Sequence, residues 1–340
     1  MALTDVNWMP MRGPVYLGVD VGGTKVAAGL VDSGGKILYK VRVPMHGSGT
    51  AQDGLASVKA AIDRVLAANP KAAIAAIGLA SPGPLDPRTG VILFTPNIPC
   101  WHDFNLREAI EQSYQLRTHV DNDANAAGLA EAIFGAGRGY SSVFYATLGT
   151  GIGTAIVLGG NLYYGRTGLA AEGGHMTVDL NAACHCECGK PGCVESLASG
   201  TALARLAREA LRRDPTGGEH MLEIAGGDIM KVTGRTVSQA WSHGDLLATE
   251  LLTEAARVLT AWLGNVVDLL EPDVFVIGGG MSEVFLHFFP QMQRDLPKWS
   301  VNKRCGDTPL VRAHFGEDSG VVGAAALCLS EPLANTTVAD

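Results

Sequence analysis

The sequence predicts an α/β protein of two lobes, each opening with a β-meander around a glycine turn. The chain has 340 residues, more than the roughly 250 to 300 at which a single hydrophobic core stops growing. Its 47% hydrophobic residues, 43 glycines and only 18% charged residues are typical of a compact α/β enzyme. A strand pattern from the start of the chain also recurs about 125 residues later, which indicates an internal duplication.

The first meander is predicted over residues 15–45. Three apolar, β-branched runs, VYLGVDV, KVAAGLVD and KILYKVRVP, are separated there by GGT and SGG turns. Apolar residues at helical spacing predict a helix over 53–68, and AAIAAIGLA after it predicts a buried strand. A shorter helix over 106–114 precedes the strand RTHV, which runs directly into DNDAN.

The second meander is predicted over residues 142–162, where SVFYATLGTGIGTAIVLGGNL repeats the order strand, Gly-Thr turn, strand, double-glycine turn, strand. The alternative is that two glycine-rich hairpins resemble each other by chance. Helices are predicted over 201–213 and 245–270, followed by the strand DVFVIGGG, a helix from Ser282, the strand LVRAHF and the helix SGVVGAAALCL. Residues 214–240 have weak periodicity, and no element is predicted there.

These elements predict a division of the chain into two lobes and two tails. Residues 15–122 form the N-terminal small lobe, and a C-terminal helix at about 318–330 packs back on it. Residues 123–317 form the C-terminal large lobe, whereas 1–14 and 331–340 are tails.

Charge and hydropathy exclude several classes of partner. The net charge is -8 and no basic run exceeds Arg212-Arg213, so nucleic acid is not an expected partner. No apolar stretch approaches the roughly 20 residues of a membrane span. The first fourteen residues lack the basic start and apolar core of a signal peptide, so we expect a cytoplasmic protein.

Three glycine turns are candidates for phosphate binding. In GVDVGGTK, Gly22 and Gly23 allow close backbone approach to a ligand, and Asp20 ends the strand. GTGIG at 149–153 would allow the same close backbone approach from the other lobe. The third run, 278–280, lies between a strand and a helix. None fits a Walker loop or a dinucleotide fingerprint, and each alone is most often only a turn. Together, at equivalent strand ends, they favour a site that holds a phosphate chain across a cleft.

A carboxylate at the start of a helix is the candidate general base. Asp123 in DNDAN lies where a strand ends and ANAAGLAEAIFG begins. A helix N-cap is the more frequent role of Asp there, but the helix terminus also keeps the carboxylate ionised and able to accept a hydroxyl proton. Asn97 and Glu172, flanked by small and apolar residues, are candidate hydroxyl-binding groups.

The segment CHCECGKPGC predicts a metal site. Three thiolates with the spacing C-x-C-x4-C and one upstream imidazole complete a closed tetrahedral zinc site, whose ligands would be His175, Cys186, Cys188 and Cys193. A Cys186-Cys188 disulfide would be strained, and no C-x-x-C redox pair is present. Cys184 or His185 as substitute ligands, or a metal-free thiol cluster, are the alternatives.

The predicted zinc would be structural because four protein ligands leave no open position. His175 lies three residues after Glu172, and Glu195 lies two residues after Cys193. One ion would therefore connect two loops that each carry a carboxylate, and would orient both carboxylates toward a ligand.

Taken together, these motifs resemble the ROK family (repressors, open reading frames and sugar kinases) of the actin and hexokinase superfamily. The match covers the chain from Gly18 to about Ala326. The resemblance implies a two-lobed, ribonuclease H-like fold with an interlobe cleft that binds sugar and Mg-ATP. It also implies a homodimer or homotetramer.

The resemblance assigns roles to particular residues. The nucleotide side would comprise Asp20, Gly22, Gly23, Thr24, Lys25, Thr150, Gly151, Gly200, Gly279 and Gly280. The sugar side would comprise Asn97, Asn122, Asp123, Glu172, His175 and Glu195, with Asp123 as the base. His175 would also bind zinc with Cys186, Cys188 and Cys193.

This chain departs from the family pattern at three positions: Cys100 and Ala171 replace glycines, and Asp121 replaces a frequent glutamate. Cys100 could thereby line the sugar pocket. The activity implied is ATP-dependent phosphorylation of a hexose, first of all the 6-hydroxyl of glucose. N-acetylmannosamine, N-acetylglucosamine or fructose are alternative substrates, and polyphosphate is an alternative donor. A sugar-sensing regulator without a DNA-binding domain and an actin-like ATPase are less favoured.

Overall fold

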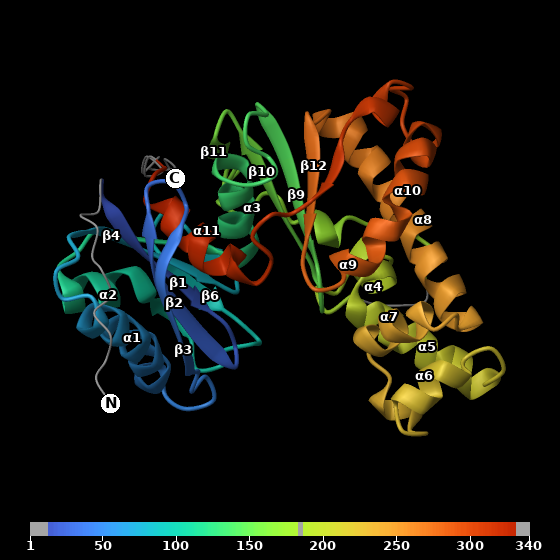
Figure 1. The fold of residues 1–340 in the computed structure, drawn as a ribbon, viewed down its shortest axis with the longest axis horizontal. Helices are drawn as coiled ribbons and strands as arrows, with labels where there is room; N and C mark the ends of the chain where they lie inside the picture. Colours follow the sequence, from blue (N-terminus) through green and yellow to red (C-terminus); the bar gives the residue numbers. More distant parts are fainter. Residues whose placement is uncertain (1–12, 183–185, 331–340) are drawn as a thin grey trace, which may run out of the picture. The chain divides into compact units, whose positions relative to one another are not determined.

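The computed structural model describes residues 13–182 and 186–330 (Figure 1). The chain divides into two compact units, each with its own sheet and its own core. The first unit contains residues 13–130, 167–169 and 318–330 of the described part, and the second contains 131–166 and 170–317. The boundary falls after Ala130, inside helix α3 (Asp123–Ile133), whereas the sequence suggested a division at Asn122.

The first unit is built on a five-stranded mixed sheet in the order β3-β2-β1-β4-β8. These strands are β1 (Val15–Val21), β2 (Lys25–Asp32), β3 (Ile37–Pro44), β4 (Ile74–Ser81) and β8 (Thr118–Asn122). The first three form the predicted antiparallel meander, and β4 and β8 continue the sheet in parallel with β1. A small sheet of β5 (Leu85–Asp86), β6 (Val91–Phe94) and β7 (His102–Asn105) was not predicted.

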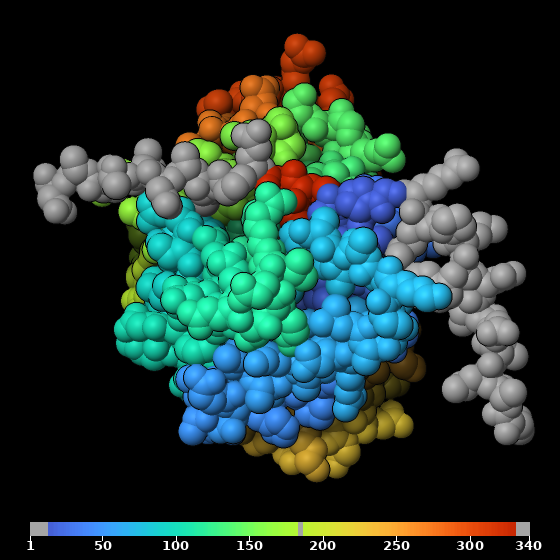
Figure 2. All heavy atoms as spheres, turned by 90° about the vertical axis from the view of Figure 1, so that its left-hand side faces the viewer, coloured from blue at the N-terminus to red at the C-terminus, as the bar shows by residue number. Residues whose placement is uncertain are grey.

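Alternate residues of these strands supply two separate cores. Leu17 and Val19 of β1 face a core that includes Val58 of helix α1 (Ala51–Ala68), which begins at a Thr50/Asp53 capping box. Helix α2 (Leu106–Tyr114) packs against the same core. In the space-filling view, the first unit, blue to green, forms a continuous closely packed surface (Figure 2).

Helix α11 (Ser319–Leu327) covers the other face of this sheet, beside β1 in Figure 1. It lies on a row of three paired glycines, Gly29 of β2, Gly18 of β1 and Gly78 of β4. A Cβ on Gly18 would lie 2.1 Å from the Val321 carbonyl oxygen. The helix therefore approaches the sheet more closely than any side chain on these strands would permit.

We expect Gly78→Ala to destabilise the protein by about 3 kcal/mol because overpacking forces backbone atoms apart. The added Cβ would lie 1.7 Å from the carbonyl oxygen of Ala324 in α11. Chemical denaturation of the variant measures this loss. Gly34→Ala is the matched control, since its Cβ would meet only the Asp32 side chain at 3.3 Å. Equal stability of the two variants would contradict the close packing of α11.

The second unit repeats the first in strand order, β11-β10-β9-β12-β13. These strands are β9 (Ser142–Leu148), β10 (Ile152–Leu158), β11 (Asn161–Leu162), β12 (Val274–Gly278) and β13 (Leu310–Arg312). As in the first unit, an antiparallel meander is followed by two strands parallel to the first. The shared topology confirms the internal duplication that the sequence predicts.

Helices pack against this sheet around the buried aromatic rings of Phe144, Trp262 and Phe275. They are α4 (Val194–Ala198), α5 (Gly200–Arg213), α6 (Glu219–Ile224), α7 (Gly234–Ser242), α8 (Leu246–Leu270), α9 (Ser282–Phe285) and α10 (Phe289–Asp295). Helices α6 and α7 cover about half of the stretch 214–240, which was left without a prediction. None of the helices in the described residues is long and apolar enough to cross a bilayer.

Candidate active site

The β1–β2 turn is held close to the loop that carries Asn97. The Gly22 N–H donates to the Lys25 carbonyl oxygen at 2.9 Å, which closes the turn. A Cβ on Gly23 would lie 2.5 Å from the Asn97 carbonyl oxygen. The glycine predicted for phosphate binding therefore also permits contact between the turn and a predicted sugar-binding residue.

Asp20 lies half-buried near the end of β1, beside helix α11. A Cβ on Gly320 would lie 2.4 Å from its carboxyl carbon, so only glycine leaves room there. Burial raises the pKa of Asp20 above its ordinary value, although the positive charges of Lys25, Arg42 and Lys40 oppose the shift. A bound cation would relieve the cost of this half-buried carboxylate.

Asp123 is the first residue of α3, and Asn122 before it supplies most of the helix cap. The Asn122 Oδ1 accepts hydrogen bonds from the N–H groups of Ala124 and Asn125 at 2.8 and 3.3 Å. The Asp123 Oδ1 also accepts from the Ala124 N–H, at 2.8 Å. Because Asn122 accepts from two N–H groups at the start of α3, the cap of this helix does not depend on Asp123 alone.

In the second unit, the β9–β10 turn is held by Glu195 of α4. The Glu195 Oε2 accepts a hydrogen bond from the Ile152 N–H at 2.8 Å. A Cβ on Gly151 would lie 2.4 Å from the same oxygen, so the glycine permits this contact. The carboxylate predicted to bind sugar thus also fixes the turn predicted to bind phosphate.

We expect Glu195→Ala to lower kcat/KM by about tenfold to a hundredfold, because it leaves the Ile152 N–H without its partner and removes a proposed sugar ligand. The KM for ATP should rise together with that for sugar, since the family resemblance assigns this turn to the nucleotide. Steady-state kinetics with each substrate varied measures both. Glu250→Ala, at an exposed position of α8 in the same unit, is the control. An unchanged KM for ATP would refute the link to the turn.

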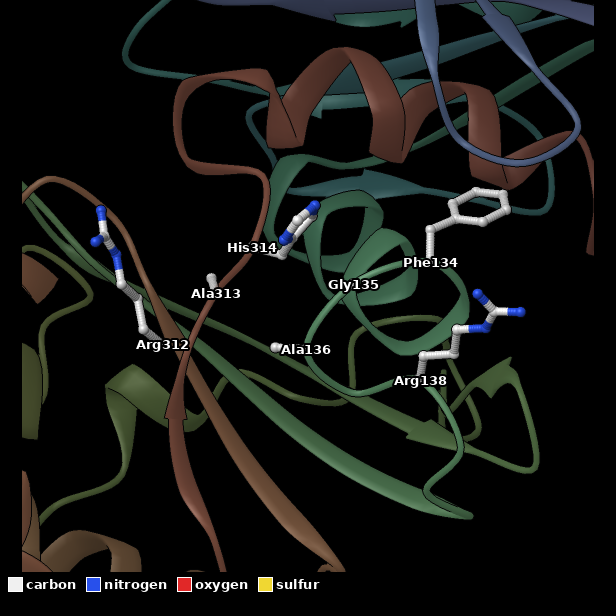
Figure 3. Close-up of a pocket in the computed structure, with 7 residues that line it drawn as sticks. All are labelled: Phe134, Gly135, Ala136, Arg138, Arg312, Ala313 and His314. Atoms are coloured by element: carbon white, nitrogen blue, oxygen red, sulfur yellow. The ribbon is translucent and has the colours of Figure 1, made fainter.

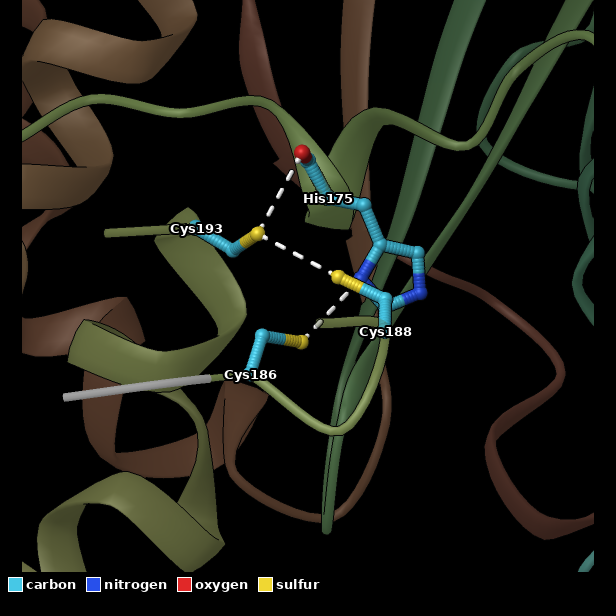
Figure 4. A group of neighbouring side chains, drawn as sticks. All are labelled: His175, Cys186, Cys188 and Cys193. Atoms are coloured by element: carbon cyan, nitrogen blue, oxygen red, sulfur yellow. Dashed lines mark hydrogen bonds between the residues drawn. The ribbon is translucent and has the colours of Figure 1, made fainter. Parts of the chain in front are cut away.

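His175 and three cysteines form one compact cluster (Figure 4). One donor atom from each of His175, Cys186, Cys188 and Cys193 lies within 4.8 Å of all the others. The Cys188 and Cys193 sulfurs are 3.6 Å apart, and the Cys186 sulfur is 3.4 Å from the His175 Nδ1. This donor set can hold a metal ion. Cys184 and His185 lie outside the described residues.

The cluster is connected to both predicted sugar-binding carboxylates of this unit. The Glu172 Oε2 lies 3.9 Å from the His175 Nε2, and the Glu195 Oε1 lies 3.9 Å from the His175 Nδ1. Burial is the main cause that raises the pKa of Glu172. Ala171, which replaces the expected glycine, has a φ of 65°, in the left-handed region that glycine prefers.

A cavity of about 810 Å³ adjoins the β9–β10 turn. The N-terminus of α5 is joined to this turn, because the Gly200 and Thr201 N–H groups donate to the Gly149 and Thr150 carbonyl oxygens at 2.8 and 3.2 Å. Gly280 also lines the cavity. The neighbouring Gly279 has a φ of +86° and packs against β9, where a Cβ on it would lie 2.3 Å from the Leu148 carbonyl oxygen.

Three arginines that were not identified from the sequence line the same cavity: Arg205, Arg208 and Arg235. They belong to α5 and α7, whose N-termini meet where a Cβ on Gly234 would lie 2.7 Å from the Gly200 α-carbon. The three guanidinium groups make this cavity favourable for an anion of the size of a nucleotide.

The predicted site residues divide between the two units. Those in the first unit are Asp20, Gly22, Gly23, Thr24, Lys25, Asn97, Asn122 and Asp123. Those in the second are Thr150, Gly151, Glu172, His175, Cys186, Cys188, Cys193, Glu195, Gly200, Gly279 and Gly280. Cys100 packs against the core of the first unit, where a Cβ on Gly54 would meet its sulfur at 2.9 Å.

A family model described as "ROK family" matches residues 16–331. The chain belongs to the ROK family. It is 35% identical over 312 residues to the glucokinase of Streptomyces coelicolor, covering 92% of this chain and 96% of the relative. It is also 30% identical over 335 residues to the N-acetylgalactosamine kinase AgaK of a Shewanella species, covering 92% of this chain and 96% of that one.

Among solved structures, the chain is similar to a ROK family glucokinase from Streptomyces griseus in complex with glucose and AMPPNP. The TM-score is 0.78 at 36% identity, with 92% of this chain and 98% of the other covered. The predicted actin/hexokinase-like α/β fold is thereby confirmed.

Proposed function

We propose that this ROK protein transfers the γ-phosphoryl group of ATP to a hexose, with glucose as substrate and glucose 6-phosphate and ADP as products. The observation that carries the proposal is the cationic cavity at the β9–β10 turn, in a chain whose glucokinase relatives match it over nearly their whole length. A nucleotide in this cavity would place its phosphates at the turn, beside guanidinium groups that favour negative charge.

Asp123 is proposed as the general base. Its carboxylate accepts the proton of the attacking hydroxyl as the oxygen bonds to the γ-phosphorus and the bond to the β-phosphate oxygen breaks. Asn97, Asn122, Glu172, His175 and Glu195 are proposed to hold the other hydroxyls by hydrogen bonds. Such fixed positioning matters because phosphoryl transfer depends mainly on alignment and charge stabilisation.

Magnesium is proposed as the companion of ATP, and Asp20 is the described carboxylate best suited to it on the nucleotide side. Desolvation raises the pKa of this half-buried carboxylate despite the positive charges of Lys25, Arg42 and Lys40, and a bound cation would offset that cost. Mg²⁺ prefers oxygen ligands and is usually held by one or two carboxylates together with substrate phosphates.

The Cys/His cluster is proposed to bind a structural Zn²⁺. In a tetrahedral site with Zn–S of about 2.3 Å and Zn–N of about 2.0 Å, ligand atoms are about 3.5 to 3.8 Å apart. Two of the donor separations support this geometry: 3.6 Å between the Cys188 and Cys193 sulfurs, and 3.4 Å between the Cys186 sulfur and the His175 Nδ1. The ion would fix the loops that carry Glu172 and Glu195 and take no part in phosphoryl transfer.

Other hexoses are the second candidate substrates, and the N-acetylgalactosamine kinase relative supports them. N-acetylmannosamine, N-acetylglucosamine and fructose belong to the same alternative. A sugar-sensing role without catalysis is a third. We also propose a cytoplasmic homodimer or homotetramer, which sedimentation velocity would distinguish from a monomer or a long polymer.

The test is ADP release with Mg-ATP across glucose, mannose, fructose, N-acetylglucosamine, N-acetylgalactosamine and N-acetylmannosamine. We expect the highest kcat/KM with glucose. A higher kcat/KM with an N-acetylated hexose would overturn the assignment of glucose as substrate but support the kinase activity. If folded protein that binds ATP phosphorylates none of these sugars, the proposed kinase activity is overturned. The sugar-sensing role without catalysis would then be the remaining candidate.

A further inference from the structure

We propose that a second groove in the described part of the second unit binds a phosphate monoester, and that its occupancy changes the rate of the proposed kinase. The groove has a volume of about 680 Å³, within the range of small-molecule sites. It is lined by Phe134, Gly135, Ala136, Arg138, Arg312, Ala313 and His314 (Figure 3). None of these residues was predicted to bind sugar or nucleotide, and none lines the cavity at the β9–β10 turn.

The groove is cationic in a protein whose net charge is -8. Arg138, Arg312 and His314 line it, and no carboxylate does. Arg312 forms an ion pair with Glu283 outside this lining. Among the described residues, the guanidinium of Arg138 makes no ion pair or side-chain hydrogen bond, so its five donors are available to an anion. Figure 3 shows His314 between the two arginines.

One buried carboxylate fixes both walls of this groove. Glu131 is 0% exposed, and its two oxygens accept hydrogen bonds from the N–H groups of Ala136 and Phe315, both at 2.9 Å. Its charge is therefore directed at backbone donors behind the groove. The Ala313 N–H donates to the Ile277 carbonyl oxygen at 2.9 Å and joins the second wall to β12. A ligand would meet walls that are already positioned, which lowers the entropic cost of binding.

The chemistry of the lining favours a phosphate monoester. A free guanidinium can bind two phosphate oxygens at once, and an imidazole can donate to a third. The ring of Phe134 offers an apolar surface for the C–H groups of a sugar carrying that phosphate. Inorganic phosphate and a hexose 6-phosphate, the product under the proposed function, share this chemistry and are both candidate ligands.

The position of the groove suggests a regulatory effect. The chain passes from the first unit to the second between Ala130 and Glu131, and returns between Glu317 and Asp318. The two walls follow the first of the chain's four crossings and precede the last within a few residues. A ligand that joins the walls would therefore restrict two of the connections between the units, and with them any motion at these connections during turnover.

Calorimetry with the full-length protein tests the binding. Inorganic phosphate and glucose 6-phosphate are titrated into the wild type, the double variant Arg138→Gln/His314→Gln and the control Arg304→Gln. Arg304 is exposed in the same unit and lines neither cavity. We expect binding to the wild type and control, weakened about tenfold to a hundredfold in the double variant. No binding to the wild type, or equal binding to all three proteins, would overturn the site.

A kinetic measurement tests the regulatory effect, which rests on the proposed kinase function. At saturating glucose and ATP, glucose 6-phosphate should alter the rate of the wild type and the control but not that of the double variant. Equal responses in all three would overturn regulation through this groove. If no hexose were phosphorylated, the proposed kinase function would be overturned. Calorimetry would still show whether the groove binds a phosphate monoester.

Discussion

Asp123→Asn is expected to lower kcat by about 10² to 10⁴ while the protein still binds sugar, because an amide cannot accept the hydroxyl proton. The substitution keeps the size of the side chain. It also leaves Asn122, which accepts from the N–H groups of Ala124 and Asn125, to cap α3. We therefore expect near wild-type stability. Coupled-assay kinetics and calorimetric titration with glucose measure the two effects separately.

Asp63→Asn is the matched control for this change, since Asp63 lies on α1 of the same unit, where it accepts a hydrogen bond from the Tyr114 hydroxyl. Its kcat should stay within about twofold of the wild type, as for most surface substitutions. Near-full activity of Asp123→Asn would overturn the assignment of the base. Loss of sugar binding together with turnover would indicate a binding role instead.

Cys193→Ser is expected to abolish stoichiometric zinc binding and to destabilise the second unit by about 4 kcal/mol or more, since loss of a metal site is among the most damaging changes. The Cys193 side chain is 0% exposed and lies 3.6 Å from the Cys188 sulfur. Sugar binding should weaken as well, because His175 and its neighbouring carboxylates would lose a fixed position. Metal content by atomic emission and thermal unfolding measure these effects, with a Tm decrease on the order of 10 °C.

Cys305→Ser provides the comparison, because Cys305 is also buried in the second unit but lies outside the cluster. It should keep one zinc per chain even if its hydroxyl lowers stability. Unchanged zinc content in Cys193→Ser would contradict this ligand set. A chelator-treated protein that has no zinc and binds glucose normally would refute the proposal that zinc fixes the loops of the sugar site.

The sequence was most informative where a local pattern determines local structure. Both meanders follow from alternating apolar runs and glycine turns, and helix α2 has the predicted bounds Leu106–Tyr114. The Cys/His cluster was also predictable, since three of its members lie within eight residues and sulfur donors have few other uses in such spacing.

Features that depend on packing between distant segments could not be predicted. Glu195 contacts the Ile152 N–H across 43 residues, and no periodicity reports such a bond. Arg208 and Arg235 became neighbours of one cavity only because Gly200 and Gly234 let two helices meet. Short elements were missed as well: α6 (Glu219–Ile224) has two turns at most, too few for a clear 3.6-residue pattern.

The row of Gly29, Gly18 and Gly78 under α11 has a consequence for the synthesis of the protein on the ribosome. Strands β1 and β2 emerge first, yet the helix that covers one face of their sheet is encoded about 300 residues later. At a synthesis rate of roughly 5 to 20 residues per second, that face of the sheet stays exposed for on the order of 15 to 60 s before α11 is made. Tyr16, Val31 and their apolar neighbours stay uncovered meanwhile, and a chaperone that binds nascent chains would have its natural target there.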